Sequence, residues 1–526
     1  MAAFTLKHAD LYVIQAVKVL GEFDSNKTQA VIKGVRHLEY LQMDYLAFNS
    51  ATLTAPLTDA ARAAYVVIGK ILKDFLNDDL DTLESTIAAV SRKTFESLCE
   101  HYQLPVGHTE ALYDDNATMA LYQLMGLLDI QPGQWVTTFY DTGRVIPEAL
   151  SGENPEFLPF NFKPAIDLWN NRRKVEGYTS DIGRFNVDLL EHYTDRYLTD
   201  KEILKNLVRS VRQNQPRLLL IPTVTRVGRR LPFIRMCRAV KQEASRLGID
   251  PLVLLDDAQG LGRLDVSSRY LLKGTQAECG SIWDYCDGIV ITGAKVTGAL
   301  MGTGAVMLSA DAIQRRQIPF ADSKLAYRAR QYGYMSPEVT RVREYNLSAK
   351  LGCIAHTPEL ASLTVALEHI PKPADVYETM SQVRHLVTRT LKNIPGLTVL
   401  EPDKELEGQF EDSIVSFYLT GYPEKGHCLK QILAERRIGG VFREYDPFPI
   451  TLPAIITFKD RRGKTVEMLR LSFDPKRLMG VDNQYLTKII YVLEAIKQAV
   501  AKLEEGFKAH DKFLREDNTL ENKSDV

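Results

Sequence analysis

The sequence predicts an α/β fold in which a large unit with a mostly parallel sheet precedes a smaller α+β unit. From about residue 110 onward, short runs of consecutive apolar, β-branched residues alternate with longer stretches of helical periodicity. Consecutive apolar residues indicate strands that are buried on both faces, as in a parallel sheet covered by helices. Beyond about residue 340 the order changes to helices, then short strands, then one long helix, which indicates a separate unit.

Amphipathic helices are expected first along the chain. Residues 1–40 and 57–104 repeat apolar side chains at helical spacing. We interpret the apolar stripe within 60–75 as packing or dimer surface rather than as a lipid-binding helix. The buried strands of the large unit are expected at 135–140, 217–224, 252–255, 288–292 and 304–308.

The smaller unit is expected to contain helices at 360–370 and 374–394, strands at 413–419, 440–443 and 468–472, and a last helix at 485–507. The tail that follows is dense in charge and poor in apolar residues, so we expect it to be disordered. We therefore divide the chain into an N-terminal helical segment (1–59), a large α/β domain (60–335), a small α+β domain (336–507) and the tail (508–526).

The composition excludes several classes of protein. The 526 residues are 45% hydrophobic and carry a net charge of −2, which argues against a bulk electrostatic grip on nucleic acid or anionic lipid. The six cysteines are scattered without a C-x-x-C pair, and the histidines show no metal-ligand spacing, so we expect no disulfide framework and no metal site. No apolar run approaches the roughly 20 residues needed to span a bilayer. We expect a cytoplasmic protein without a nucleic-acid or membrane partner.

Two segments of the large unit combine a buried strand with residues that can do chemistry. In LVLLDDAQGLG (252–262) the strand ends on Asp256 and Asp257, which places carboxylates at the sheet edge where α/β enzymes bind ligands. Taken alone, a helix cap and a turn explain these acids equally well. In TGAKVTGALMGTG (292–304) Lys295 lies among glycines, which let backbone approach a ligand closely. Desolvation there would lower the pKa of the lysine amine, as a Schiff-base nucleophile requires. For an isolated lysine, however, a surface position in a glycine-rich hairpin is the commoner explanation.

A third segment opens an apolar helix with Asn116, Ala117 and Thr118, in YDDNATMALYQLMGLL (113–128). The amides and hydroxyl at a helix start form a ready phosphate site. An ordinary asparagine cap accounts for the same pattern when the segment is considered alone.

Together, in order and spacing, these segments resemble the class V aminotransferase family of fold-type-I enzymes that depend on pyridoxal 5′-phosphate (PLP). That family includes cysteine desulfurases and isopenicillin N epimerase-like proteins. The resemblance covers about residues 44–500 and extends to further stretches: YLAFNSATLTAP (45–56), LDIQPGQWVTTFY (128–140), HTPEL (356–360) and MLRLSF (468–473).

The resemblance implies a role for each matching residue. Lys295 would hold PLP as a Schiff base and move protons, and Asp256 would keep the pyridine nitrogen protonated. Arg470 would bind the substrate carboxylate through a charge-assisted pair. The remaining implied contacts are Gln259 on the phenolic oxygen, Tyr140 stacked on the ring, Ala117, Thr118, Thr292 and Thr357 on the phosphate, and Asn49 and Arg226 on the substrate. Thr357 would reach the phosphate across a dimer interface.

Several positions depart from the family pattern. Ala294 stands before the lysine where the family usually has histidine, so one phosphate contact is missing. Arg226 stands where the family has asparagine; its guanidinium could contact the substrate carboxylate or replace the hydrogen bond to the phenolic oxygen, or the pocket could be remodelled. We prefer Tyr140 to Asp141 as the ring-stacking residue, because only an aromatic side chain can stack on the pyridine ring. The segment GGVFREYDPFP (439–449) lacks the nucleophilic cysteine of the desulfurases, so we do not expect persulfide chemistry.

The sequence therefore predicts a homodimeric PLP enzyme that acts on an amino acid, with transamination as the first hypothesis. A lyase or an epimerase of the same family is the alternative for the reaction. A non-catalytic binding protein with this fold is the alternative for the class, although the presence of Lys295, Asp256 and Gln259 favours an enzyme. The basic run RVGRR (226–230) is expected to be solvated or to face the substrate rather than nucleic acid.

Overall fold

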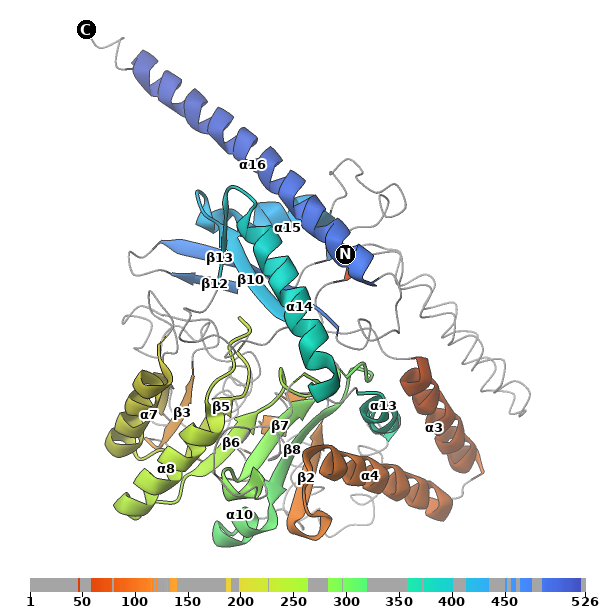
Figure 1. The fold of residues 1–526 in the computed structure, drawn as a ribbon. Helices are drawn as coiled ribbons and strands as arrows, with labels where there is room; N and C mark the ends of the chain where they lie inside the picture. The colour runs from red at the N-terminus through yellow and green to blue at the C-terminus, as the bar shows by residue number, and fades with distance from the viewer. Residues whose placement is uncertain are drawn as a thin grey trace.

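The computed structural model of the protein is shown in Figure 1. The described residues are 46–47, 58–77, 80–114, 116–117, 120–121, 124, 128, 130, 133–139, 186–190, 198–225, 227–263, 282–295, 297–318, 357–370, 373–400, 413–434, 450–451, 456–459, 464–474 and 485–521. Residues 1–40 and the strand expected at 440–443 lie outside this set.

The large unit is built on a seven-stranded sheet with the order β2-β8-β7-β6-β5-β3-β4. Its strands are β2 (Thr109–Asp114), β3 (Trp135–Phe139), β4 (Asn186–Leu190), β5 (Leu218–Pro222), β6 (Leu252–Asp256), β7 (Gly288–Thr292) and β8 (Gly304–Ser309). β8 is antiparallel to both of its neighbours, β2 and β7, and the other pairings are parallel. Six of the seven strands therefore run in one direction, which confirms the mostly parallel sheet.

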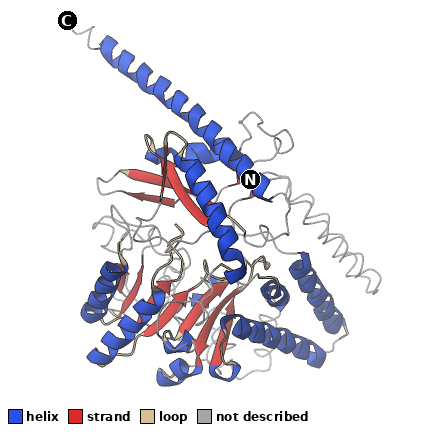
Figure 2. Ribbon diagram, in the orientation of Figure 1, coloured by secondary structure: helices blue, strands red, loops and turns tan. Residues whose placement is uncertain are grey.

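Both faces of this sheet are buried, as the runs of consecutive apolar residues predict. In β5, Leu219 and Ile221 belong to one hydrophobic core and Leu218 and Leu220 belong to another. The first core also receives side chains from α4 (Leu80–Tyr102), α7 (Asp200–Asn214), α8 (Phe233–Leu247) and α13 (Thr357–Glu368). The second core is completed by α10 (Ala310–Arg315) and by helical residues between 117 and 128. In Figure 2 the strands of the large sheet (red) lie side by side, with helices (blue) on either side of them.

Local signals explain where the covering helices begin and end. Thr199 caps α7 in a capping box, in which the Thr199 backbone amide donates to the Glu202 carboxylate at 2.8 Å. α8 ends at Gly248, whose left-handed φ of 67° closes the helix. The two helices that precede the sheet, α3 (Thr58–Leu76) and α4, confirm the helical interpretation of 57–104.

α13 packs with α3 and α4 rather than with the elements that follow it. The Thr94 hydroxyl on α4 donates to the Leu360 carbonyl at 3.0 Å, and Leu363 and Ala366 enter the first core of the large unit. The sequence division at 335/336 had grouped this helix with the small domain. The apolar residues of α13 do not indicate in the sequence which core the helix joins, because either core would bury them equally well.

The smaller unit contains an antiparallel sheet with the order β12-β13-β10-β9. Its strands are β9 (Leu397–Val399), β10 (Ile414–Leu419), β12 (Ile456–Lys459) and β13 (Thr465–Ser472), and its helices are α14 (Pro373–Lys392), α15 (Gly426–Ala434) and α16 (Tyr485–Glu521). A separate hydrophobic core joins β9, β10 and β13 to α14, α15 and α16, which supports the α+β interpretation. A short parallel pair joins β1 (Leu46–Ala47) to β11 (Ile450–Thr451).

α16 is longer than the sequence predicted and extends away from the body of the protein (Figure 1). Residues 508–521 are helical, so the expectation of a disordered tail is corrected for this part of it. The segment is rich in helix-forming lysine, glutamate and leucine, and Lys508 pairs with Glu504 one turn earlier at 3.2 Å. Composition alone did not distinguish an exposed helix from a disordered chain. Among the described helices, none combines the length and hydropathy needed to cross a lipid bilayer.

Candidate functional site

The carboxyl edge of the large sheet gathers the segments that the sequence singled out. β2, β6 and β7 run in the same direction, so the residues that follow them emerge at one edge. Asn116 and Ala117 follow β2, Asp256 ends β6, and Lys295 lies three residues beyond the end of β7. Segments as far apart in sequence as 116 and 295 therefore meet at this edge.

Lys295 is buried, with 6% of its surface exposed, in the loop that joins β7 to β8. The loop is closed by backbone bonds from Gly293 to the Thr303 carbonyl at 2.7 Å and from Ala299 to the Gly293 carbonyl at 3.1 Å. The Thr297 hydroxyl also donates to the Gly293 carbonyl. A buried amine in a closed loop corrects the alternative interpretation of Lys295 as a surface lysine in a hairpin. Ala294 beside it is only partly buried.

The start of the helix after β2 lies in close contact with Gly304, the first residue of β8. Thr292 pairs with Gly304 across β7 and β8. A Cβ atom on Gly304 would lie 2.0 Å from the Asn116 carbonyl carbon, so glycine is required for this approach. Ala120 donates to the Asn116 carbonyl at 3.0 Å, as the first helical turn requires, and Ala117 is completely buried. The expected phosphate contacts of Ala117 and Thr292 thus lie on adjacent segments.

The two acids at the end of β6 have different surroundings. Asp257 is completely buried, and it accepts hydrogen bonds from the Tyr102 hydroxyl at 2.7 Å and from the Thr223 hydroxyl at 2.6 Å. Burial, together with the Asp257 charge and this bond, raises the pKa of Tyr102 well above its usual range. Asp256 is 7% exposed and accepts from the Ala258 amide at 3.0 Å. The Asp257 carboxylate is therefore used by hydrogen bonds inside the large unit. Asp256 is the acid in the position that the family pattern assigns to the ring nitrogen.

Gln259 is held by a residue that the sequence analysis did not single out. Arg263 donates to the Gln259 side-chain oxygen at 3.0 Å and to its backbone carbonyl at 3.2 Å. The other guanidinium nitrogen donates to the Ser472 hydroxyl at 2.9 Å, in the smaller unit. Gln259 and Arg263 are both buried.

Arg470 lies on the face of β13 that is turned toward the large unit. Side chains two residues apart share one face of a strand, so Arg470 and Ser472 face the same way. Ser416 on β10 is the register partner of Arg470, and its hydroxyl donates to the Val227 carbonyl at 3.3 Å. Arg470 is 2% exposed. The structure therefore brings the strand of the expected carboxylate anchor against the β5 and β6 turns of the large unit.

Thr357 begins α13, and this helix packs on the loop of Lys295 in the same chain. The Leu300 amide donates to the Ser362 hydroxyl at 2.9 Å, and a Cβ atom on Gly293 would lie 2.6 Å from a Leu363 methyl carbon. Thr357 itself is completely buried within the chain. Its helix thus lies beside the expected site of its own subunit, and a reach toward a second subunit stays a prediction.

Four expected site residues, Asn49, Thr118, Tyr140 and Arg226, lie outside the described residues. Within the RVGRR run, Arg229 is completely buried and donates to the Leu198 carbonyl at 2.5 Å, so this arginine belongs to the packing of the large unit. Among the described residues, no group of three or more His, Cys, Asp or Glu side chains could hold a metal ion.

Sequence reasoning missed Tyr102, Thr223, Arg263 and Ser472. The spacing of four residues between Gln259 and Arg263 was a usable signal, because it brings two side chains together in a tight turn or a helix. Tyr102 contacts Asp257 over 155 residues, and Ser472 contacts Arg263 over 209 residues. No local pattern marks contacts over such separations.

Comparison with solved structures identifies the fold. A variant of C-DES with glycine covalently linked to its PLP cofactor matches with a TM-score of 0.54 and 14% identity, over 86% of this chain and 96% of that one. An alanine–glyoxylate aminotransferase from Nostoc sp. matches with a TM-score of 0.51 and 14% identity, over 87% and 95% of the two chains. The chain has the fold of the fold-type-I PLP-dependent enzymes.

A cysteine desulfurase from Thermococcus onnurineus shares this PLP-enzyme fold, with a TM-score of 0.52 and 12% identity over 88% of this chain and 96% of that one. No protein-family profile and no curated protein sequence matches the chain significantly. The likeness therefore lies in the fold rather than in the overall sequence. It confirms the fold class that the sequence predicted.

Proposed function

We propose that this chain is a PLP-dependent enzyme that acts on an amino acid, and that its reaction is transamination. One observation carries the proposal. Asp256 and Lys295 are both buried; Asp256 ends β6 and Lys295 follows the adjacent parallel strand β7, at the same edge of the sheet. A lysine and a carboxylate so placed are the two groups that a pyridine aldehyde cofactor needs on its protein.

The surrounding residues fit the rest of the cofactor. Gly304 lets the helix start at Asn116 approach β8 closely, directly beside Thr292 on β7. Backbone amides at a helix start suit a phosphate group. Ala117 and Thr292 would hold the phosphate there, together with Thr118 and Thr357. Gln259 would contact the phenolic oxygen, and Tyr140 would stack on the ring.

When bound, PLP supplies an electron-withdrawing ring that acidifies the α-carbon of an attached amino acid. Asp256 would hold the proton on the ring nitrogen, and the buried amine of Lys295 would carry protons to and from the substrate. Arg470 would bind the substrate carboxylate, helped by Asn49 and Arg226. Burial at the edge of the sheet would keep water away from these groups.

Lysine labelling tests the cofactor assignment. Holoenzyme reconstituted with PLP should absorb visible light and lose this band on borohydride reduction, with the reduced label on Lys295. Lys295→Ala should abolish the label. Lys488→Ala is the matched control, because Lys488 is equally buried but lies on α16 in the smaller unit, and it should retain the label. A colourless wild-type protein, or a label on another lysine, would overturn the proposal.

Product analysis tests the reaction type. We expect holoenzyme mixed with single amino acids to yield a keto acid and pyridoxamine phosphate. A cleaved side chain with PLP retained would instead indicate a lyase, and loss of optical activity alone would indicate an epimerase. A coloured protein that converts none of the amino acids would favour a binding protein with this fold.

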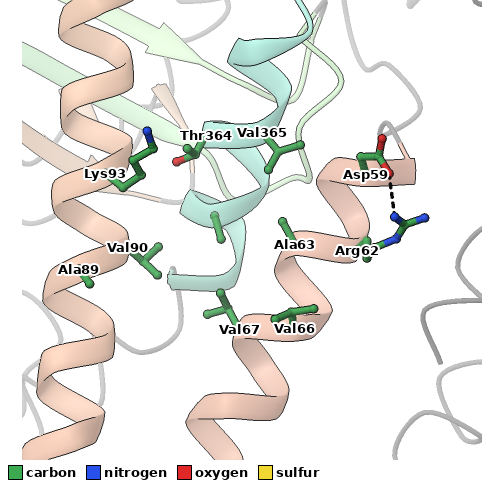
Figure 3. Close-up of a pocket in the computed structure, with 11 residues that line it drawn as sticks. Asp59, Arg62, Ala63, Val66, Val67, Ala89, Val90, Lys93, Thr364 and Val365 are labelled. Carbon is green, nitrogen blue, oxygen red and sulfur yellow. Dashed lines mark ion pairs between the residues drawn. The ribbon is translucent and has the colours of Figure 1, made fainter. Parts of the chain in front are cut away.

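We also propose that the enzyme is a homodimer that uses the groove between α3, α4 and α13 (Figure 3). The groove has a volume of about 660 Å³ and is lined largely by apolar side chains, among them Val66, Val90 and Val365. It continues along the helix that Thr357 begins, so a second copy seated there would lie beside the site. Val66→Asp should convert the dimer to monomer in light scattering. Leu486→Asp, at a similarly exposed position on α16, should not.

A cytoplasmic location and the absence of a nucleic-acid partner complete the proposal. The four described cysteines, Cys99, Cys237, Cys286 and Cys428, are free thiols, which suits a reducing compartment. Fractionation of cells that express the chain at its natural level tests the location.

A further inference from the structure

Arg263 joins the expected cofactor site to the smaller unit. It lies in the turn after β6, 3% exposed, where its backbone amide donates to the Gly260 carbonyl at 2.7 Å. One guanidinium nitrogen bonds both oxygens of Gln259, and the other bonds the Ser472 hydroxyl at 2.9 Å. These hydrogen bonds replace bonds to water that the buried guanidinium has lost, so they tie Arg263 to both units.

The bond to Gln259 decides which way the side-chain amide points. A guanidinium has only donors, so the Gln259 atom that meets Arg263 must be the amide oxygen. The amide nitrogen then lies on the opposite branch and is directed away from Arg263. A flipped amide would place two donors against Arg263 and would present its oxygen to the cofactor side.

The orientation matters because the phenolic oxygen of PLP is an acceptor that carries negative charge when deprotonated. Only the amide nitrogen of Gln259 can donate to it, and an amide oxygen facing it would repel it. Arg263 therefore determines whether Gln259 stabilises or destabilises the deprotonated oxygen.

The bond to Ser472 reaches the strand of Arg470. These two residues share one face of β13, and Ser416, the register partner of Arg470, bonds the Val227 carbonyl. The Ser472 bond and the Ser416 bond thus hold the same face of the small sheet against the large unit at two points.

We propose that Arg263 is a positioning residue that fixes the Gln259 amide with its nitrogen toward the cofactor and fixes β13, with Arg470, at the substrate side of the same site. The inference rests on the proposed PLP function. Arg263 acts through Gln259 and Ser472 and has no role of its own in the chemical step.

The first test follows the visible band of bound PLP in the holoenzyme as a function of pH. Arg263→Met keeps an unbranched, flexible side chain that can pack in place of the arginine stem, but removes every donor. We expect the midpoint of the band's pH titration to rise by on the order of one unit, because a donor beside the phenolic oxygen is lost. PLP binding to the apoprotein should weaken about tenfold.

A double-mutant cycle separates positioning from a general loss of structure. Gln259→Ala alone should raise the midpoint by a similar amount, and Arg263→Met added to it should change the midpoint no further. Arg263→Lys, which keeps one donor group, should retain a midpoint close to that of the wild type. Additive shifts in the double variant, or an unchanged midpoint in Arg263→Met, would overturn the inference. If Arg263→Met does not fold, as judged by thermal unfolding of the apoprotein, Arg263→Lys and the Gln259→Ala background carry the comparison.

The second test uses two probes that differ by one carboxylate. Aminooxyacetate and methoxyamine both react with the aldehyde of bound PLP, but only the first carries a group for Arg470. Ser472→Ala should lower the rate preference for aminooxyacetate severalfold and leave the band midpoint unchanged, and Ser472→Thr should restore the preference. An unchanged preference in Ser472→Ala would overturn the β13 part of the inference.

The outcomes distinguish this inference from the function on which it rests. A wild-type protein that binds PLP at Lys295 while Arg263→Met keeps the wild-type midpoint would leave the function standing and remove the positioning role. A wild-type protein that stays colourless with PLP would overturn both.

Discussion

Tyr102→Phe isolates the hydroxyl that supports the completely buried Asp257 carboxylate. The Tyr102 oxygen donates to one Asp257 oxygen at 2.7 Å, and the Thr223 hydroxyl donates to the other at 2.6 Å. Tyr102 is 1% exposed and packs in the first core of the large unit. Phenylalanine keeps the ring and its packing, so the substitution removes the hydrogen bond and little else.

The cost follows from the charge and burial of the acceptor. A hydrogen bond to a charged group contributes about 1.5–3 kcal/mol, and the acceptor left behind is buried without a replacement from water. We therefore expect Tyr102→Phe to lower the free energy of unfolding of the apoprotein by about 2 kcal/mol. Tyr418→Phe, at the one partly buried position of β10, should change it by less than about 0.5 kcal/mol.

The pH dependence gives a second signature of the same contact. The folded-state pKa of Tyr102 is raised, first by burial and then by Asp257, so its stabilising effect is complete below the unfolded tyrosine value of about 10. It is lost as pH rises above that value, because the unfolded chain then releases a proton that the folded protein retains. Wild type should lose stability more steeply above pH 10 than Tyr102→Phe does, in urea unfolding followed by fluorescence. Equal slopes, or a loss below about 0.5 kcal/mol at neutral pH, would refute the assigned hydrogen bond.

Three further results are expected. Gly304→Ala should weaken PLP binding to the apoprotein about tenfold or more, because its Cβ would displace the Asn116 backbone. Gly421→Ala, where a Cβ meets nothing within 4 Å, should leave binding unchanged. Equal binding by the two variants would contradict the role of Gly304 in the phosphate site. Arg470→Met should abolish most of the rate preference for aminooxyacetate over methoxyamine, and retention of the preference would exclude Arg470 as the carboxylate anchor. Among the described cysteines, iodoacetamide should modify Cys428 first in peptide mass spectrometry, since the other three are buried. Burial raises the pKa of the Cys428 thiol, so the rate should climb with pH beyond the usual thiol range; a rate that is flat above pH 7 would contradict this.

The sequence alone determined that Asp256 and Lys295 follow buried strands, because strand runs and glycine turns are local patterns. The segment of Ala117 was grouped with them only by the resemblance to the class V aminotransferase family, since β2, the strand before it, was not among the predicted strands. The burial of Lys295 was not determined, because a glycine-rich loop has the same sequence on a surface as in a closed turn. The tertiary bonds from Gly293 and Ala299 decide it.

Only the tertiary structure decided how the two units meet. The order of segments predicted a separate α+β unit, but α13 packs in the first core of the large unit. The antiparallel direction of β8 and the continuation of α16 to Glu521 were likewise decided by the tertiary structure. The contacts of Asp257 with Tyr102 and of Arg263 with Ser472 span 155 and 209 residues. Periodicity and spacing carry information over a few turns of chain, whereas hydrogen bonds and core packing select partners by position in space, and no local pattern encodes that choice.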